Sequence, residues 1–107
     1  MSKTSRFAVG LTAAMLLAGT MSFAQSQGEA TYKARCQGCH GAQGVPNPGI
    51  AKAMGVKPAN DPAVKSTAEA QMIEVTTNGK AKMPAFKGKL TDAQIKDAVV
   101  YFRAFAK

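Results

Sequence analysis

The sequence predicts an all-α fold with three main helices joined by loops, and two observations predict it. First, three segments open with a Ser or Thr followed three residues later by Glu or Gln, which is the pattern of a helix capping box. These pairs are Ser26 with Glu29, Ser66 with Glu69, and Thr91 with Gln94. Second, no stretch of the sequence shows the alternating pattern of a half-buried strand.

The first helix is expected to begin near residue 27 and to run into the turn that holds both cysteines. Residues 41–62 contain four glycines and all but one of the five prolines, which predicts a loop with one short helical turn near residues 50–54. The second helix is expected over about 67–77, because Asn78-Gly79 is a good left-handed terminator.

The third helix, over about 92–106, has the strongest signals. Leu90 and Ile95 flank its cap as a hydrophobic staple, and apolar side chains then recur at helical spacing. These side chains are Ile95, Ala98, Val99, Phe102 and Ala106.

Both cysteines and the single histidine fall within one window, Cys36-Gln37-Gly38-Cys39-His40. On a helical turn, positions i, i+3 and i+4 share one face, so the two sulfurs and the imidazole can meet one flat object. Two thiols at this spacing can each add to a vinyl group of a porphyrin while the imidazole reaches the iron, which is the c-type haem pattern. We therefore predict one covalent haem c attached through Cys36 and Cys39, with His40 as an iron ligand.

Other interpretations of this window have less support. A structural zinc site usually needs four ligands, and the chain has no further Cys or His. A thioredoxin-like dithiol would lie near a βαβ pattern, which the flanking segments lack. That dithiol and a plain structural disulfide are the weaker alternatives.

The first 24 residues have the features of a secretory signal peptide. Lys3 and Arg6 precede an uncharged stretch over residues 7–24, which ends in Ser22-Phe23-Ala24 with small residues at a cleavage point. We expect residues 1–24 to be removed and residues 25–107 to form the exported, periplasmic domain of a bacterial protein. The alternative is an uncleaved membrane anchor, because the uncharged stretch approaches the length of a bilayer span.

Residues 25–107 are enough for one domain but too few for a generous apolar core. A chain of this size usually needs a staple, and a covalent porphyrin has two large apolar faces against which side chains can pack. We therefore expect the haem-free chain to be poorly folded.

The chain has no second histidine, so the other axial ligand of the iron must be of another kind. Met83 is the first choice, because Pro84 favours an extended backbone that can point the Met83 side chain at iron, and Phe86 can anchor the loop. The alternatives are Met54, a lysine or an open position. Met72 lies in the middle of the second predicted helix and fits a core position.

At these residues the chain resembles the class I monohaem cytochromes c, in particular the small soluble bacterial and photosynthetic carriers. The resemblance covers residues 26–107. Members of this family have an N-terminal helix that ends in C-x-x-C-H, a distal methionine loop often written M-P-x-F, and a C-terminal helix that crosses the first. Met83-Pro84-Ala85-Phe86 fits that loop. The resemblance implies a small all-α fold wrapped around one haem.

The family also places a glycine and an aromatic residue ahead of the first cysteine, where two helices cross closely. Gly28 and Tyr32 match this pattern, and Tyr101 is well placed as the partner aromatic residue. In the family a proline carbonyl after the binding motif usually accepts the N–H of the proximal imidazole, which fixes its tautomer. The resemblance gives this role to Pro48, with Pro46 as the alternative. With no tryptophan in the chain, the contacts to the haem propionates stay unassigned.

The expected function follows from the two axial ligands. Imidazole and thioether together would fill both axial positions, and the soft sulfur would favour ferrous iron. We therefore expect a one-electron carrier rather than an enzyme. The alternatives are a haem subunit bound to one dedicated redox enzyme, a ligand-binding haem sensor with a displaceable Met83, and a colourless dithiol oxidoreductase.

The charge of the chain indicates the kind of partner. Removing Lys3 and Arg6 leaves 12 basic and 6 acidic residues, a net charge of +6. Four lysines bracket Met83, with no acidic residue between Glu74 and Asp92. These lysines are Lys80, Lys82, Lys87 and Lys89. A haem edge beside them would be steered onto acidic docking surfaces of redox proteins. The alternative is a solvated lysine-rich loop without a partner.

Two other kinds of partner that a basic protein can bind, nucleic acid and membranes, fit the sequence less well. Export and the absence of a binding motif argue against nucleic acid, despite the high isoelectric point. Residues 25–107 are not expected to insert stably into a membrane, although anionic lipid could form a weak secondary surface.

Overall fold

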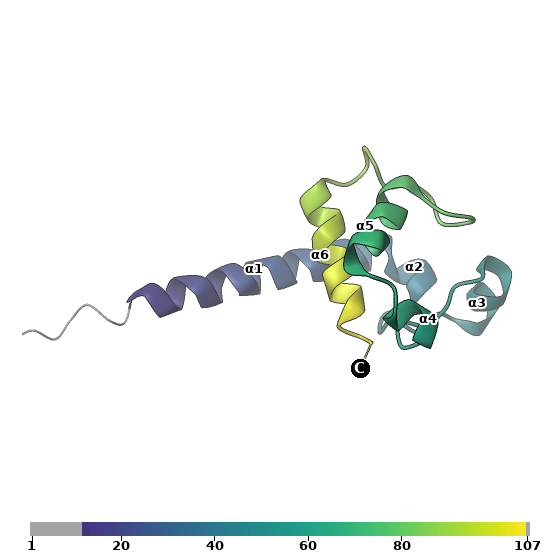
Figure 1. The fold of residues 1–107 in the computed structure, drawn as a ribbon, viewed down its shortest axis with the longest axis horizontal. Helices are drawn as coiled ribbons and strands as arrows, with labels where there is room; N and C mark the ends of the chain where they lie inside the picture. The colour runs from purple at the N-terminus through teal and green to yellow at the C-terminus, as the bar shows by residue number, and fades with distance from the viewer. Residues whose placement is uncertain (1–11, 107) are drawn as a thin grey trace, which may run out of the picture.

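The computed structural model describes residues 12–106, with side chains from residue 23 onward. Within this range the chain is all-α, as predicted (Figure 1). Its helices are α1 (Thr12–Arg35), α2 (Gln37–His40), α3 (Pro48–Met54), α4 (Pro62–Lys65), α5 (Glu69–Asn78) and α6 (Asp92–Arg103). The only β pairing in the described range is two isolated bridges in the segment between α5 and α6.

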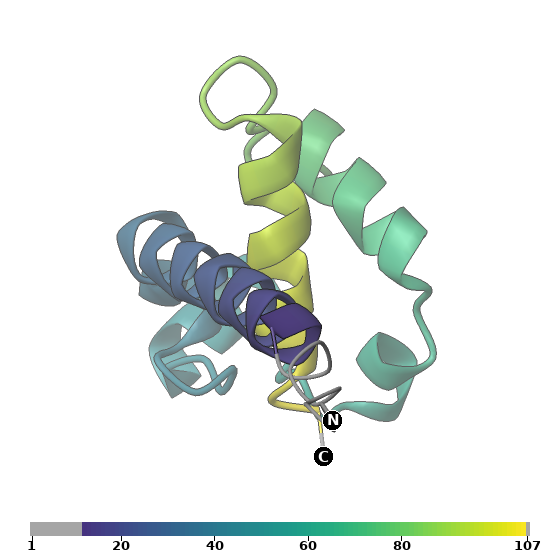
Figure 2. The same cartoon turned by 90° about the vertical axis from the view of Figure 1, so that its left-hand side faces the viewer.

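The main helices form a crossed pair with a third helix beside it. α6 crosses the C-terminal half of α1, and α5 packs against α6, while the N-terminal half of α1 projects away from the other helices (Figures 1 and 2). Gly28 makes the crossing close, because a Cβ at this position would overlap the backbone carbonyl oxygen of Asp97 and lie 3.3 Å from Cβ of Tyr101. The family resemblance placed a close helix crossing at this glycine.

The apolar core lies between α5, α6 and the segment that joins them. Phe86, Ile95 and Val99 are its buried members. Four partly buried side chains pack against them, namely Met72, Ile73, Met83 and Leu90. Leu90 thus reaches the cluster of Ile95, as the predicted staple requires.

The helix predicted over residues 92–106 begins where expected but ends earlier than expected. The capping box is confirmed: the amide of Gln94 donates to the Thr91 hydroxyl (3.1 Å), and the amide of Thr91 donates to the Gln94 side chain (2.9 Å). The predicted end was wrong, because α6 stops at Arg103 and residues 104–106 continue as turns. Apolar spacing continues to Ala106, but backbone bonds from Ala104 to both Tyr101 and Val100 tighten the last turn.

The prediction of a helix start at Ser26 and Glu29 was wrong. α1 runs without a break from Thr12 through Ser26 to Arg35, so the amides near Ser26 are bonded within the helix. A capping side chain stabilises a helix only where backbone N–H groups lack partners, and no proline between residues 12 and 35 forces the helix to begin there.

The capping box predicted for Ser66 and Glu69 was also wrong. Asp61 and Pro62 instead open the short helix α4, where the Asp61 carboxylate accepts from the amide of Ala63 (2.9 Å). The hydroxyls of Ser66 and Thr67 both donate to the carbonyl of Ala63, so they close α4 rather than open α5. α5 begins later than expected, with Ala68 as its N-cap.

The glycine-rich and proline-rich stretches behave largely as predicted. α5 ends at Asn78, and Gly79 follows with a φ of 80° and an amide that donates to the Val75 carbonyl (2.7 Å). The expected short helical turn is α3, which begins at Pro48 because the Asn47 side chain caps it.

The boundary expected after Ala24 falls inside α1. Residues 1–11, which include Lys3 and Arg6, lie outside the described residues. Between residues 12 and 106, no helix has the length and apolar character needed to cross a membrane.

Candidate haem site

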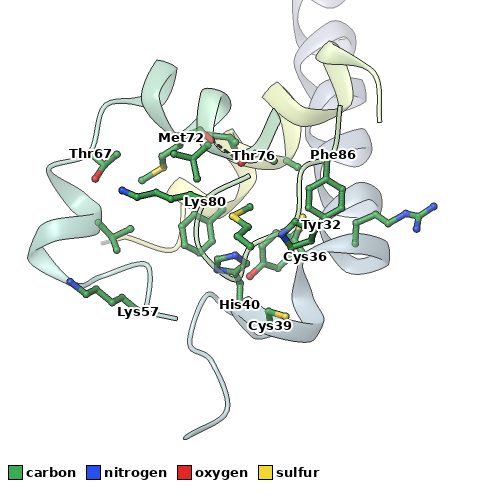
Figure 3. A pocket seen from close by; sticks show the side chains of 18 of the residues that line it. Tyr32, Cys36, Cys39, His40, Lys57, Thr67, Met72, Thr76, Lys80 and Phe86 are labelled. Atoms are coloured by element: carbon green, nitrogen blue, oxygen red, sulfur yellow. Dashed lines mark hydrogen bonds between the residues drawn. The ribbon is translucent and has the colours of Figure 1, made fainter. Parts of the chain in front are cut away.

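The cysteine and histidine window forms a single helical turn directly after α1. The amide of Cys36 donates to the Tyr32 carbonyl (2.8 Å), and the amides of Cys39 and His40 both donate to the Cys36 carbonyl (3.2 and 3.0 Å). Cys36, Cys39 and His40 therefore project from one turn, and all three line the same cavity (Figure 3). This is the arrangement that the sequence pattern requires.

Both cysteines are free thiols, so the structure does not contain the disulfide alternative. Cys36 is half-buried and Cys39 is exposed. Burial, with a smaller contribution from Cys39, raises the pKa of the Cys36 thiol to about 11. A redox-active dithiol needs a thiolate of lowered pKa, so the environment of Cys36 speaks against a thioredoxin-like role.

The surroundings of His40 favour the neutral imidazole, which is the form that binds metals. Burial lowers the pKa of its imidazole, which favours the neutral form. Its ring meets the edge of Phe102, with centroids 5.2 Å apart. The Nδ1 atom is fully buried and has no hydrogen-bond partner, whereas buried polar atoms are normally satisfied.

The hydrogen bond that the family resemblance implied for a proline carbonyl is therefore not formed in this structure. Pro48 is exposed and is the first residue of α3, directly after the N-cap residue Asn47. Pro46 is buried but likewise does not bond to Nδ1 of His40.

Tyr32 organises the side of the site nearest α1. It is almost fully buried, and its hydroxyl donates to the carbonyl of Gly41 (2.5 Å), which follows the cysteine and histidine window. Burial raises the pKa of Tyr32 to about 12, so this donor stays protonated. The ring of Tyr101 lies 5.2 Å from that of Tyr32, and Phe102 and Phe105 complete the cluster.

The Met83 loop is a tight turn held by backbone bonds. The amides of Lys80 and Met83 donate to each other's carbonyls (3.1 and 2.9 Å), and Ala81 between them has a φ of 53°. The amide of Phe86 then donates to the Thr76 carbonyl (3.0 Å), which joins the loop to α5. Phe86 is buried, so it anchors the loop as expected.

All three thioether candidates line the cavity, so position alone does not choose among them. Met54 is the last residue of α3 and is 38% exposed. Met72 has its sulfur 3.7 Å from the guanidinium nitrogen Nη1 of Arg103, which fits a packing role. Met83 lies against the core cluster at the end of its turn.

The cavity has a volume of about 440 Å³ and mainly apolar walls. Besides the residues already named, α5 and α6 contribute Val75, Ala98 and Val99 to it. Sequence reasoning gave an apolar face to the C-terminal helix but did not show that Phe102 would face His40. Two thiols, an imidazole with an unpartnered buried nitrogen, and a thioether around apolar walls fit a c-type haem.

The four lysines near Met83 do not form one set. All are exposed, but only Lys80 and Lys82 line the cavity, and Nζ of Lys82 donates to the Ala53 carbonyl (2.5 Å). Lys87 and Lys89 lie further along the segment and away from the cavity lining.

An all-α fold with this cavity defines a monohaem c-type cytochrome. The chain belongs to the family described as cytochrome c oxidase, cbb3-type, subunit III, whose model matches residues 23–102. It is 42% identical over 74 residues to cytochrome c6 of Leptolyngbya boryana, an alignment that covers 69% of this chain and 84% of that protein.

A solved structure of similar fold is the KustC0563 c-type cytochrome, with a TM-score of 0.68 and 30% sequence identity. The match covers 75% of this chain and 98% of that one. The chain is a cytochrome c6-like electron carrier and not an enzyme, and its family implies a covalent haem c at the Cys36 and Cys39 motif.

Proposed function

We propose that residues 25–107 act as a periplasmic one-electron carrier whose haem c is attached through Cys36 and Cys39 and ligated by His40 and Met83. The observation that carries this proposal is that these four side chains line one cavity with mainly apolar walls. When bound, haem c supplies a one-electron couple at its iron.

The chain contributes ligands, exclusion of water and rigidity. His40 and Met83 would supply an imidazole and a thioether to the iron and would leave no open position for a substrate, which separates a carrier from a haem enzyme. Val99, Phe86 and Phe102 keep water from the site, and the bonded turn around Met83 holds the loop in place. A dry and rigid environment changes little between oxidation states, so the barrier to electron transfer stays low.

Ferric absorption spectra of the haem-loaded protein test the Met83 assignment. We expect Met83→Ala to remove the sulfur-to-iron charge-transfer band, and Met54→Ala, the matched control, to keep it. Loss of the band in the Met54→Ala variant alone would move the ligand to Met54. A band that persists in both variants would exclude either methionine as the ligand.

Mass spectrometry of protein exported from a bacterium that attaches haem c tests the attachment and the leader together. The expected product begins at Gln25 and carries the added mass of one haem. A mature protein with the mass of its amino acids alone would contradict attachment, and retention of residues 1–24 would favour the anchor alternative.

Lys87 and Lys89, which lie outside the cavity lining, are proposed to face acidic docking surfaces of redox partners, whereas Lys80 and Lys82 of the predicted set line the cavity. Their exposure and the absence of acidic residues over 75–91 support this surface. The rate of electron transfer to the partner should fall as ionic strength rises. A rate that does not depend on salt would favour a lysine-rich loop without a partner.

The family description supports a second candidate function, because it names a subunit of an oxidase. In that case the chain would be a haem subunit held permanently by one enzyme. Purification from the native host under mild conditions distinguishes the two, since a carrier elutes alone and a subunit elutes with its enzyme. Carbon monoxide binding to the reduced protein at neutral pH would instead favour a sensor with a displaceable Met83.

A further inference from the structure

The cavity combines apolar walls with an excess of positive charge. Its lining contains four basic residues and no acidic one among the residues that the structure describes: Arg35, Lys57, Lys80 and Lys82. In the same part of the chain the one ion pair is between Lys33 and Glu29, so none of the four has a carboxylate partner. Such a cavity favours a ligand that carries negative groups.

Two of these four basic residues, Arg35 and Lys82, are placed for roles other than binding a ligand at the far end of the cavity. Arg35 directly precedes Cys36 and therefore lies at the thiol end of the cavity. Lys82 donates to the Ala53 carbonyl and joins the Met83 loop to α3. Lys57 and Lys80 remain, and they come from different walls, because Lys57 follows α3 and Lys80 follows α5.

Lys57 and Lys80 lie on one side of the cavity. Figure 3 shows both side chains on the side of Thr67, away from Cys36 and Cys39. The hydroxyl of Thr67 is already bonded to the Ala63 carbonyl (2.8 Å), so it does not serve as a free donor. The two ammonium groups are therefore the charged donors on this side, and the neutral amide of Gln71 also lines the cavity.

The other charged or titratable groups are placed differently. Arg103 is not part of the cavity lining, and its Nη1 donates to the backbone carbonyl of Thr67 (2.6 Å). The remaining titratable groups belong to the end near the thiols. They are Tyr32, Cys36, Cys39 and His40.

The positions of the porphyrin substituents connect the thiol end of the cavity with the end that holds Lys57 and Lys80. Its two vinyl groups lie on one half of the ring and its two propionates on the opposite half, so thiols that bind the vinyl half direct the carboxylates to the far end. We propose that Lys57 and Lys80 bind the two haem propionates at the end of the cavity opposite Cys36 and Cys39. This inference rests on the haem attachment of the proposed function.

The physical reason is the cost of placing two carboxylates beside apolar walls. A carboxylate removed from water is costly unless a charged donor pairs with it, and charge-assisted hydrogen bonds from ammonium groups are among the stronger ones. One lysine from each wall also gives each propionate its own partner. Since Lys80 belongs to the turn of Met83, its propionate contact would hold that loop as well.

Resonance Raman spectroscopy of the ferrous, haem-loaded protein tests the contacts directly, because the propionate bending bands respond to hydrogen bonds at the carboxylates. We expect Lys57→Gln and Lys80→Gln each to shift or weaken a propionate band. Lys87→Gln, which removes the same charge from a residue outside the cavity lining, should leave the bands unchanged. Lys57→Arg keeps a charged donor and should restore most of the native band.

The midpoint potential is the second readout. Loss of either ammonium leaves a propionate charge less neutralised, which favours ferric iron, so both cavity variants should fall below the Lys87→Gln control at the same pH and salt. If the Raman bands and potentials of Lys57→Gln and Lys80→Gln coincide with those of the control, the inference is overturned. A failure of the proposed function is distinct, because the native protein would then lack covalent haem or the charge-transfer band.

Discussion

Replacing Gly28 by alanine tests the helix crossing on which the site depends. Gly28 is buried in α1, and a Cβ there would overlap the carbonyl oxygen of Asp97 and lie 3.0 Å from the carbonyl carbon of that residue. These obstacles are backbone atoms of α6, which cannot rotate away as a flexible side chain can. The two helices would have to separate.

The expected loss can be worked out from two opposing effects. Overpacking a tight contact costs about 1–3 kcal/mol, and a backbone obstacle places this site at the upper end of that range. Alanine is the better helix former by about 1 kcal/mol, which offsets part of the cost. The free energy of unfolding should therefore fall by about 2 kcal/mol, which for a domain of this size lowers the melting temperature by about 8–16 °C.

Thermal unfolding of the haem-loaded protein, followed by far-ultraviolet circular dichroism, measures this loss. Gly38→Ala is the matched control, because Gly38 lies in α2 and, its own helical turn aside, no protein atom lies within 4 Å of the added Cβ. We expect the control to melt at or slightly above the native temperature. A Gly28→Ala protein that melts with the control would refute the close crossing.

The remaining predictions concern the loop, the helix cap, the buried tyrosine and the haem. Ala81→Gly should raise the free energy of unfolding by up to about 1 kcal/mol, because the φ of 53° disfavours a side chain, and urea unfolding would detect it. Thr91→Ala should lower that free energy by about 1 kcal/mol through loss of the capping box, and an unchanged urea midpoint would contradict it. The pKa of Tyr32 is raised from 10.0 to about 12 in the folded protein. The stability that the protonated Tyr32 hydroxyl contributes is therefore complete below pH 10 and is lost as the pH rises towards 12. The free energy of unfolding, measured across this pH range, should fall less in the Tyr32→Phe variant than in the native protein. The Cys36→Ala, Cys39→Ala double variant should lack a cooperative melt, because without haem the cavity of about 440 Å³ is not filled by apolar ring surface; a native-like transition would show that the chain folds without it.

Local sequence signals determined those parts of the fold and site that depend on few neighbouring residues. The spacing of Cys36, Cys39 and His40 follows from one helical turn, so the shared face was readable from five residues. Thr91 and Gln94 satisfy each other's amides without help from the rest of the chain, and Gly79 ends α5 through its own backbone freedom.

Signals that compete with a neighbour were decided by the tertiary structure. The hydroxyl of Ser66 closes α4 because Asp61 and Pro62 start a helix just before it, so its apparent cap for the next helix is not used. The N–H groups near Ser26 are already bonded within α1. A local cap pattern cannot show whether another segment has taken the same partners.

The sequence by itself determined that this chain is helical and carries the attachment pattern of a c-type haem, because both depend on contacts a few residues apart. Only the tertiary structure decided which side chains share the cavity: it placed Phe102 against His40, Lys82 against the Ala53 carbonyl, and Lys57 on the same side as Lys80. These placements bring together segments tens of residues apart. They depend on how α1, α5 and α6 pack against one another. Close backbone contacts such as the one at Gly28 determine this packing, and no local sequence pattern encodes it.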